Sequence, residues 1–468
     1  PGVDKSGAER FGRLHLPAPE LNKQKGYKVL TADQWLFSSM EKTRLPKGLW
    51  DWTPIKLQGI FFRVDVQRYR ELHESILGLY DYHGLPPEPK DEAAMKLLDM
   101  TFRELMLQHS LKDLLDLCCI GFGSYGLGYN IPALYGLWFV TPVAVEAYIA
   151  QKLDGTIHTV ELVRSGYGML WERMVKKDGL KIRYDIEIDS INRNLEDCTK
   201  RIEIKLKNKE KVSGKSSSAT KHDAEKKTKD SGWYNADVIE ADFLIFAAPM
   251  QQAFQQLVKD ATDFEKKVCE DIQCVDCNVC LFKTAKKEGE GCLTFYPESL
   301  QPEFTKRPDG EVYAERNIIR CYCPEKEKDT KFRYTAAYQH FTKPQTGKSK
   351  EIAEKSKKFI TDETKTVNPT PAKPEPELVH QAHWDNYFPH FSVEGIVKER
   401  LPWRVFETQG KNRTWYIGSS VSFESIEDIT NYNIQLLESQ GFGKKIAFPP
   451  KPSSRYDPDN NARYLAAL

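Results

Sequence analysis

The sequence has 468 residues, which at roughly 150 residues per domain indicates two or three domains. Lys and Arg number 68 and Asp and Glu 67, so the net charge of +1 points to neither nucleic acid nor acidic lipid as a partner. With 28 Gly, 26 Pro and 40% hydrophobic residues, the chain is not collagen-like or of low complexity and can build a sizeable core.

The first two segments differ in their periodicity. Residues 1–62 are rich in Gly, Pro and Trp without a strong period, and we expect an irregular remnant of an N-terminal part. Residues 63–158 predict a helical layer on the substrate side, whose first helix ends near Gly84. Thr101 and Glu104 have the spacing of a capping box. The apolar positions of the first helix are Val66, Tyr69, Leu72, Ile76 and Tyr80.

The most apolar stretch of the chain is not a membrane span. Residues 131–150 contain Pro132, Pro142 and Glu146, which argue against a helix in lipid. The chain begins with Pro1, and no apolar leader-like segment follows it. We therefore expect a protein without a membrane span, placed in the cytoplasm.

Residues 159–255 predict strands and a helix of a layered α/β unit. Short strand spacing at 159–163 and helical spacing at 167–176 precede a long strand at 182–193 and a second strand at 202–206. A Lys-rich insertion at 205–232 is typical of a solvated hairpin tip, not of a nucleic-acid surface.

The end of this unit is almost wholly apolar. Residues 242–249 predict a buried strand, with a helix following Pro249 directly. Together with the preceding strands, this run favours an α/β arrangement with a ligand at the strand ends.

Residues 256–395 predict a β-rich domain, and residues 396–446 a final strand and helix. Within 256–395, a connector at 345–376 includes a helix at 350–360, and the expected strands are 279–282, 318–322 and 332–338. In the last ordered unit a strand at 414–417 ends at Gly418, and a helix follows over 425–440. We expect residues 447–468 to be a tail.

Ten cysteines in this length do not indicate a disulfide scaffold. Cys274, Cys277 and Cys280 form a C-x-x-C-x-x-C run without a fourth ligand at a suitable distance, which favours reduced thiols on a strand over a metal site. His380 and His383 lie three residues apart beside aromatic residues, which favours a surface or packing role. We expect no metal.

Residues 121–126 match G-x-G-x-x-G, the pattern in which glycines let a pyrophosphate approach a helix N-terminus. A helical segment comes before this pattern and Pro132 follows it, so a turn between helices is favoured. An unrelated α/β enzyme that binds a nucleotide here stays open as an alternative. A different anion site is indicated at Gly418, where a strand end opens a helix whose N-terminal amides can bind an anion or a flavin oxygen.

Several motifs together resemble the flavin-dependent amine oxidase superfamily. Residues 161–170 look like its entry into a helix, residues 182–193 its strand near adenine, and residues 242–249 its hydrophobic strand ending in Ala-Ala-Pro. The most similar branch is that of the FAD-dependent polyenoic fatty acid isomerases. Its likeness is carried by the segments Phe122–Tyr135, Trp384–Phe391 and Thr414–Glu427, and the whole resemblance covers most of 100–200, 238–255 and 380–440.

The resemblance implies a mixed α/β (α+β) fold: an FAD/NAD(P)-binding-type layered domain with a helical and β-rich substrate domain. Family members begin with a βαβ unit carrying G-x-G-x-x-G, which no segment before residue 60 supplies, so the layered domain is expected to be incomplete at its N-terminus. The family also has an acidic residue soon after the strand-end glycine, where this chain has Ser419 and Ser420. A hydroxyl would replace that contact.

The resemblance further implies FAD as cofactor and a set of contacts. The cofactor-side residues are Ile188, through its backbone near adenine, and Gly418, Ser419, Ser420, Ile426 and Glu427 around the ribityl–flavin region. The substrate-side candidates are Tyr125, Tyr387, Phe388 and His390. No catalytic residue is assigned, because the isoalloxazine would carry the chemistry.

These observations predict an FAD-dependent oxidoreductase or isomerase that takes hydride from an apolar small molecule such as an unsaturated fatty acid. An amine oxidase-type flavoenzyme is the first alternative, and a truncated, non-catalytic relative unable to hold FAD is the second. The sequence does not decide the oligomeric state or the electron acceptor.

Overall fold

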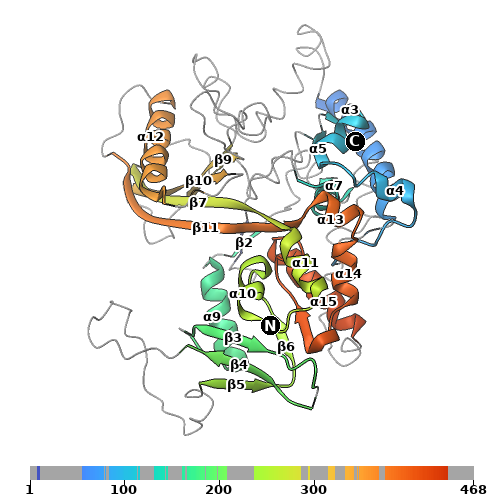
Figure 1. Ribbon diagram of the computed structural model, residues 1–468. Helices are drawn as coiled ribbons and strands as arrows, with labels where there is room; N and C mark the ends of the chain where they lie inside the picture. Colours follow the sequence, from blue (N-terminus) through green and yellow to red (C-terminus); the bar gives the residue numbers. More distant parts are fainter. Residues whose placement is uncertain are drawn as a thin grey trace.

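The computed structural model describes a mixed assembly of helices and four small sheets (Figure 1). The described residues are 8–10, 55–78, 80, 84–112, 114–115, 131–142, 144–145, 161–163, 166–184, 186–197, 199–207, 237–285, 293–295, 315–321, 332–341, 345, 347–367 and 375–440.

Within the described residues, several helices lie in the segment expected to be helical. They are α3 (Ile55–Leu77), α4 (Glu92–Lys96), α5 (Phe102–Gln108) and α7 (Ala133–Phe139). The four apolar positions from Val66 to Ile76 are buried as the spacing predicts. The Thr101–Glu104 capping box is confirmed, with Glu104 N–H donating to Thr101 Oγ1 at 3.2 Å and Thr101 N–H donating to Glu104 Oε2 at 2.8 Å.

The limits of the first helix differ from the prediction. α3 begins at Ile55, inside the segment expected to be irregular, and it ends at Leu77 instead of near Gly84. Gly78 has φ +68° and donates its N–H to the Glu74 carbonyl at 2.9 Å. A left-handed glycine at this place ends a helix without steric cost, so Gly78 terminates α3.

A five-stranded antiparallel sheet confirms the β-rich region. Its order is β11-β7-β10-β9-β8, and the two longest strands, β7 and β11, pair along most of their length across the middle of the molecule (Figure 1). Helix α12 (Ser349–Val367) packs against β7 and β11 and covers a small second core. The strands are β7 (Ile272–Ala285), β8 (Leu293–Phe295), β9 (Glu315–Cys321), β10 (Phe332–Phe341) and β11 (Glu377–Phe391).

The expected long strand over 182–193 is much shorter in the structure. A three-stranded antiparallel sheet has the order β3-β4-β5, and its strands are β3 (Ile188–Asn192), β4 (Ile202–Leu206) and β5 (Val238–Ala241). Because β4 has five residues, it provides partners for 188–192 alone. The strand prediction was therefore wrong for the described residues 182–184, 186 and 187, and Asp185 lies outside the described residues. Ile182 and Tyr184 are exposed. Helix α9 (Gly166–Asp178) and strand β2 (Glu161–Val163) precede this sheet, and β2 pairs with β1 (Ala8–Arg10).

The apolar run over 242–249 forms one short strand, in a different sheet from β5 just before it. After β5 the chain enters β6 (Leu244–Phe246), which pairs in parallel with β12 (Thr414–Tyr416). Leu244 and Phe246 are buried, but Ile245 is 64% exposed, so the prediction of a fully buried strand was wrong for one face. The helix expected after Pro249 is present as a π-helical turn, η3 (Met250–Phe254), that continues into α10 (Gln255–Leu257).

The remaining helices surround the β6–β12 pair. They are α11 (Asp263–Asp271), α13 (Val393–Val397), α14 (Leu401–Glu407), the 3-10 turn η7 (Lys411–Arg413) and α15 (Ile426–Ser439). One core cluster runs from the helical layer through β6 and β12 to α15. Among the helices that the structure describes, none is both long enough and apolar enough to span a bilayer.

Candidate functional site

The candidate site lies where the two parallel strands β6 and β12 end. Parallel strands place their carboxyl ends at the same edge, and ligands of α/β sheets bind in the crevice beyond that edge. Residues 247–251 follow β6 and residues 417–425 follow β12. The register pairs Tyr416 with Phe246, and Ile417 N–H donates to the Phe246 carbonyl at 3.0 Å, so the two loops begin side by side.

Gly418 permits the close approach of these loops. Its φ is +88°, a conformation that L side chains rarely adopt, and a Cβ there would lie 3.4 Å from the Ala247 carbonyl oxygen. Any side chain at this position would strain the backbone, and its Cβ would lie in van der Waals contact with the neighbouring loop. The glycine therefore leaves backbone uncovered at the strand end.

Ser420 and Ser422 fix the loops from the inside. Met250 N–H donates to Ser420 Oγ at 3.2 Å, which joins the loop after β6 to the loop after β12. Ser422 Oγ donates to the Gly418 carbonyl at 3.0 Å. Both serines are buried. The Ser420 hydroxyl thus holds the shape of the site.

Two buried acceptor atoms at this edge lack a partner. Within the described part of the chain, Glu424 Oε2 and Gln251 Oε1 make no hydrogen bond. Gln251 directs its Nε2 to Cys274 Sγ at 2.9 Å. A buried polar atom without a partner costs free energy comparable to a lost hydrogen bond, so such atoms call for a bound donor.

Glu424 titrates well above the ordinary range of a glutamate. Burial raises its pKa to about 7, although hydrogen bonds with the Ser419 side chain and the Phe388 backbone lower it. Near neutral pH this carboxyl is therefore divided between its charged and protonated forms.

The N-terminus of α15 closes one side of the site. Ser425 is the N-cap, and its Oγ accepts the Asp428 N–H at 3.0 Å. Burial raises the pKa of Asp428 to about 7 as well, and its carboxylate bonds the Ser425 hydroxyl. Ile426 and Glu427, two of the predicted cofactor residues, are exposed on the first turn.

An aromatic cluster lies directly beside Glu424. Tyr135 and Phe139 of α7 meet Phe388 and His390 of β11 and Phe423 of the loop. The ring centroids of Phe139 and Phe423 are 4.7 Å apart and stacked, and those of Phe388 and Phe423 are 5.2 Å apart and edge-to-face. Phe388 and His390 stack at 5.3 Å, and Tyr135 lies edge-on to both. These contacts make a dry wall beside the polar strand ends.

Phe388 connects the wall to the polar edge through a left-handed backbone. Its φ is +49°, at an irregular point of the β11–β7 register, and its ring is fully buried. Its backbone bonds Glu424, and its carbonyl lies 2.8 Å from His390 Nδ1. Burial lowers the pKa of His390 to about 4, so the ring is neutral and Nδ1 carries the hydrogen that it donates. Two hydrogen bonds thus hold a strained aromatic residue at the site.

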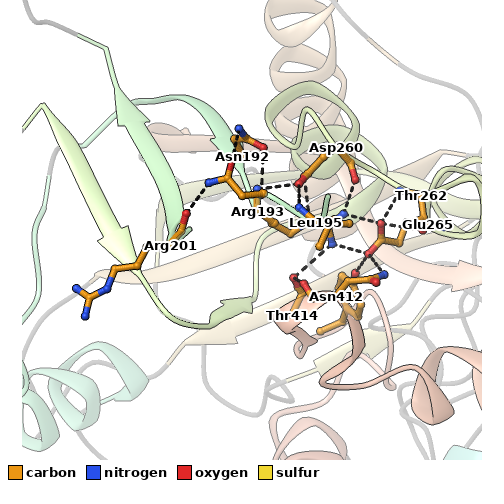
Figure 2. A network of polar contacts seen from close by, with 11 residues as sticks. Asn192, Arg193, Leu195, Arg201, Asp260, Thr262, Glu265, Asn412 and Thr414 are labelled. Carbon is orange, nitrogen blue, oxygen red and sulfur yellow. Dashed lines mark hydrogen bonds and ion pairs between the residues drawn. The ribbon is translucent and has the colours of Figure 1, made fainter. Parts of the chain in front are cut away.

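A buried ionic network joins β12 to Arg193 and to Glu265 of α11 (Figure 2). Arg193, just after β3, donates Nη1 to Glu265 Oε1 at 2.6 Å and Nη2 to Glu265 Oε2 at 2.8 Å. Its Nε donates to Asp260 Oδ1 at 3.1 Å. On β12, Thr414 Oγ1 accepts from Arg193, and the Tyr416 hydroxyl donates to Glu265. The strand that leads to Gly418 is therefore fixed at two alternate residues.

The structure brings together most of the predicted cofactor residues. Gly418, Ser419, Ser420, Ile426 and Glu427 lie on one loop and the helix start that follows it. Ile188 lies apart in β3, which pairs with β4 and not with β6 or β12.

The substrate-side candidates are distributed differently. Phe388 and His390 belong to the aromatic wall, while Tyr387 stacks on His340 with ring centroids 5.6 Å apart. Tyr125 and the glycine pattern 121–126 lie outside the described residues. His383 Nε2 lies 2.8 Å from Asp276 Oδ2, which gives the expected packing role a definite partner.

Sequence reasoning missed Glu424, Gln251 and Arg193. Glu424 follows a buried aromatic residue in a Ser-Phe-Glu-Ser stretch, and a carboxylate beside such a residue was the available signal. Arg193 directly follows the alternating strand residues of β3, where a charge next to a buried position was the signal. Nothing in the sequence marks Gln251.

Comparison with solved structures gives a likeness with a TM-score above 0.5. A CLA-producing fatty acid isomerase from P. acnes superposes with a TM-score of 0.57 at 18% identity, over 89% of this chain and 86% of that chain. The two chains share a fold. This confirms the mixed α/β fold class in its coarser form.

Two other solved structures are less similar. Putrescine oxidase bound to putrescine gives a TM-score of 0.46 at 12% identity, over 89% of this chain and 87% of that chain. Cyclohexylamine oxidase from Brevibacterium oxydans gives 0.47 at 10% identity, over 84% and 76%. At these TM-scores the likeness establishes no common fold. No protein-family model and no curated protein matches the sequence.

Proposed function

We propose that the protein is an FAD-dependent oxidoreductase or isomerase that takes hydride from an apolar small molecule such as an unsaturated fatty acid. The observation that carries this proposal is the meeting of two surfaces at the ends of β6 and β12. One is polar and has unpaired acceptors, Glu424 Oε2 and Gln251 Oε1, and the other is the wall around Phe388.

The described residues fit the ribityl–flavin part of FAD. Gly418 leaves the strand end uncovered, and the two unpaired acceptors suit a ligand that carries several hydroxyl or N–H donors. Gly418, Ser419, Glu424 and Gln251 would hold this part, with Ile426 and Glu427 at the helix start. Bound flavin supplies two-electron hydride transfer.

The rest of the chemistry falls to this chain's own side chains. The aromatic wall excludes water, and neutral His390 adds no charge that would attract it. Trp138 stacks on Tyr135, and in the described part of the chain its buried Nε1–H has no acceptor. An unpaired donor within an aromatic wall suits a substrate with a long apolar body and an acceptor group.

The domain division belongs to the same proposal. Segments 159–255 and 396–446 would form the cofactor side, and segments 63–158 and 256–395 the substrate side. The parallel pairing of β6 with β12 supports the first grouping, because each of the two cofactor segments contributes one strand. The contact of Tyr135 with Phe388 supports the second.

An amine substrate is the second candidate, and the two unpaired acceptors favour it, because an ammonium group offers three donors. Anaerobic mixing of the FAD-loaded protein with an unsaturated fatty acid or with a primary amine separates the candidates. The compound that is the substrate should bleach the flavin absorption or be converted to product. The other compound should leave the flavin absorption unchanged and should itself remain unchanged.

The decisive experiment measures whether the purified chain retains FAD. The purified chain is incubated with excess FAD, desalted and examined by visible absorption. We expect the wild type to keep a flavin spectrum and Gly418→Ala to lose it. Gly179→Ala is the matched control, since Gly179 also has a positive φ (+62°) but has nothing within 4 Å of its Cβ position. Loss of flavin from the wild type would favour the alternative of a non-catalytic relative.

A further inference from the structure

Glu424 is placed between the two surfaces of the site. It directly follows the fully buried Phe423, whose ring packs against Phe388, and it bonds the Phe388 backbone and the Ser419 side chain. Its Oε2 is buried and unpaired in the described part of the chain. One oxygen is therefore available while the rest of the carboxyl is held in place.

The titratable groups around Glu424 come from three elements. On β7 these are Cys274 and Cys277, whose thiols have a pKa of about 12 because of burial, with a smaller contribution from the Glu424 charge. On β11 they are Asp385, which also acts on Cys274, and His390, which is neutral.

The third element is α15, with Glu427 and Asp428. Asp428 is engaged with its own cap, Ser425, and Glu427 is exposed to solvent. The thiols and His390 are neutral at pH 7, and the other neighbours named are acids. None of the neighbours named therefore pairs with the buried Oε2 of Glu424 in the described part of the chain.

We propose that Glu424 is a catalytic residue that exchanges a proton, through Oε2, with an N–H or O–H group of the ligand bound at the ends of β6 and β12. In the forward direction the ligand's X–H bond breaks, its electron pair stays on X, and an O–H bond forms on Oε2. The reverse step returns the proton. The inference rests on the function proposed above, in which that ligand is the flavin or the substrate beside it.

The alternative for Glu424 is a positioning role, in which it only fixes the backbone of Phe388. The two roles differ in their response to a ligand. A donor that binds Oε2 stabilises the carboxylate, so ligand binding near neutral pH must release protons from the Glu424 side chains that carry one. A carboxyl that only holds Phe388 keeps its proton.

Infrared difference spectroscopy tests the inference, with FAD as the probe. Wild type is compared with Glu424→Gln, which removes the titrating group, and with Asp428→Asn, which removes the second carboxyl of similar pKa. We expect the protonated-carboxyl band of wild type minus Glu424→Gln to titrate near pH 7. Addition of FAD should reduce this band in wild type and in Asp428→Asn, and release protons that Glu424→Gln does not release.

Each outcome is decisive. A band that does not respond to FAD, in protein that retains flavin, would overturn the proton-exchange role while the proposed function stands. If no variant retains flavin, the proposed function fails and the inference fails with it. If Glu424→Gln does not fold, wild type is compared with Glu424→Asp, which keeps a carboxyl. The expected result is then a shifted protonated-carboxyl band and an altered proton release on addition of FAD.

Discussion

The side-chain amide of Gln409 bonds both the N–H and the C=O of Tyr416, as the backbone of a neighbouring strand would. Its Oε1 accepts the Tyr416 N–H at 2.7 Å, and its Nε2 donates to the Tyr416 carbonyl at 2.8 Å. Nε2 also reaches the hydroxyl of Tyr432 on α15 at 3.0 Å. One amide therefore closes the edge of β12 opposite β6 and joins that strand to the helix bordering the site.

Replacement of Gln409 by Ala should lower the free energy of unfolding by about 2–3 kcal/mol, because it leaves the buried N–H and C=O of Tyr416 without partners. Urea unfolding measures the change. Gln67→Ala is the control, since Gln67 makes an exposed hydrogen bond to Glu71 on α3, and its effect should stay within about 0.5 kcal/mol. Equal effects of the two substitutions would contradict the role given to Gln409.

Glu265 makes the stability of the protein depend on acid pH. Burial raises its pKa, but hydrogen bonds from Arg193 and Tyr416 and the charge of Arg193 outweigh burial and bring it down to about 2. Because the folded pKa lies below the ordinary value of 4.5, the stabilisation is complete above pH 4.5 and is lost as the pH falls towards 2. The loss should be about 3 kcal/mol.

Urea unfolding of wild type and Glu265→Gln between pH 6 and pH 2 measures this dependence. The difference in stability between the two proteins should shrink below pH 4.5. Glu399→Gln is the control, because Glu399 forms a surface pair with Lys267 at 2.7 Å, and such exposed pairs contribute little to stability. A constant difference across the range would show that the carboxylate charge of Glu265 does not stabilise the fold.

Two buried histidines should make the stability of the protein depend on pH in a higher range than Glu265 does. Burial lowers the pKa of His73 and of His390 to about 4 from an ordinary value of 6.5. Both rings stay neutral in the folded protein while the unfolded chain takes up protons, so stability falls as the pH drops from 6.5 to 4. Histidine ring signals in NMR should titrate near pH 4 at both positions, and His390→Gln should remove one of them. A midpoint near 6.5 for His390 would contradict the neutral ring assigned to the aromatic wall.

Local patterns predicted the parts of the fold that depend on neighbours in sequence. The capping box at Thr101 and the helix after Ser425 each need contacts only three residues away, and both are present. The strand at 182–187 failed because its existence depends on how far β4 extends, which the alternation of 182–193 alone cannot reveal.

The site was predictable in part for the same reason. Gly418 is marked by the sequence itself, since a glycine between a strand and a helix indicates a special backbone. The Arg193 network joins residues 72 and 221 positions apart, and no local period encodes such contacts. Phe423 precedes Glu424 in the sequence, but only the fold brings the ring of Phe388 against Phe423 beside it.

Phe388 offers a test of backbone strain at the site. Replacing its buried ring with Ala should cost about 3–5 kcal/mol through lost packing, while the left-handed φ of +49° stays unfavourable for Ala. Gly adopts this conformation freely, so Phe388→Gly should be more stable than Phe388→Ala by about 1 kcal/mol. This reverses the usual order in a strand, where Gly is the worse residue.

Phe282 is the matched control for this comparison. It is equally buried, in β7, and is not among the residues with positive φ, so Phe282→Gly should be less stable than Phe282→Ala by about 1 kcal/mol. Urea unfolding of the four variants gives the two differences. Opposite signs at the two positions would establish that Phe388 is held against its own preference. The same sign at both would mean that the hydrogen bonds with Glu424 and His390 do not hold a strained backbone, and that Phe388 is an ordinary core residue.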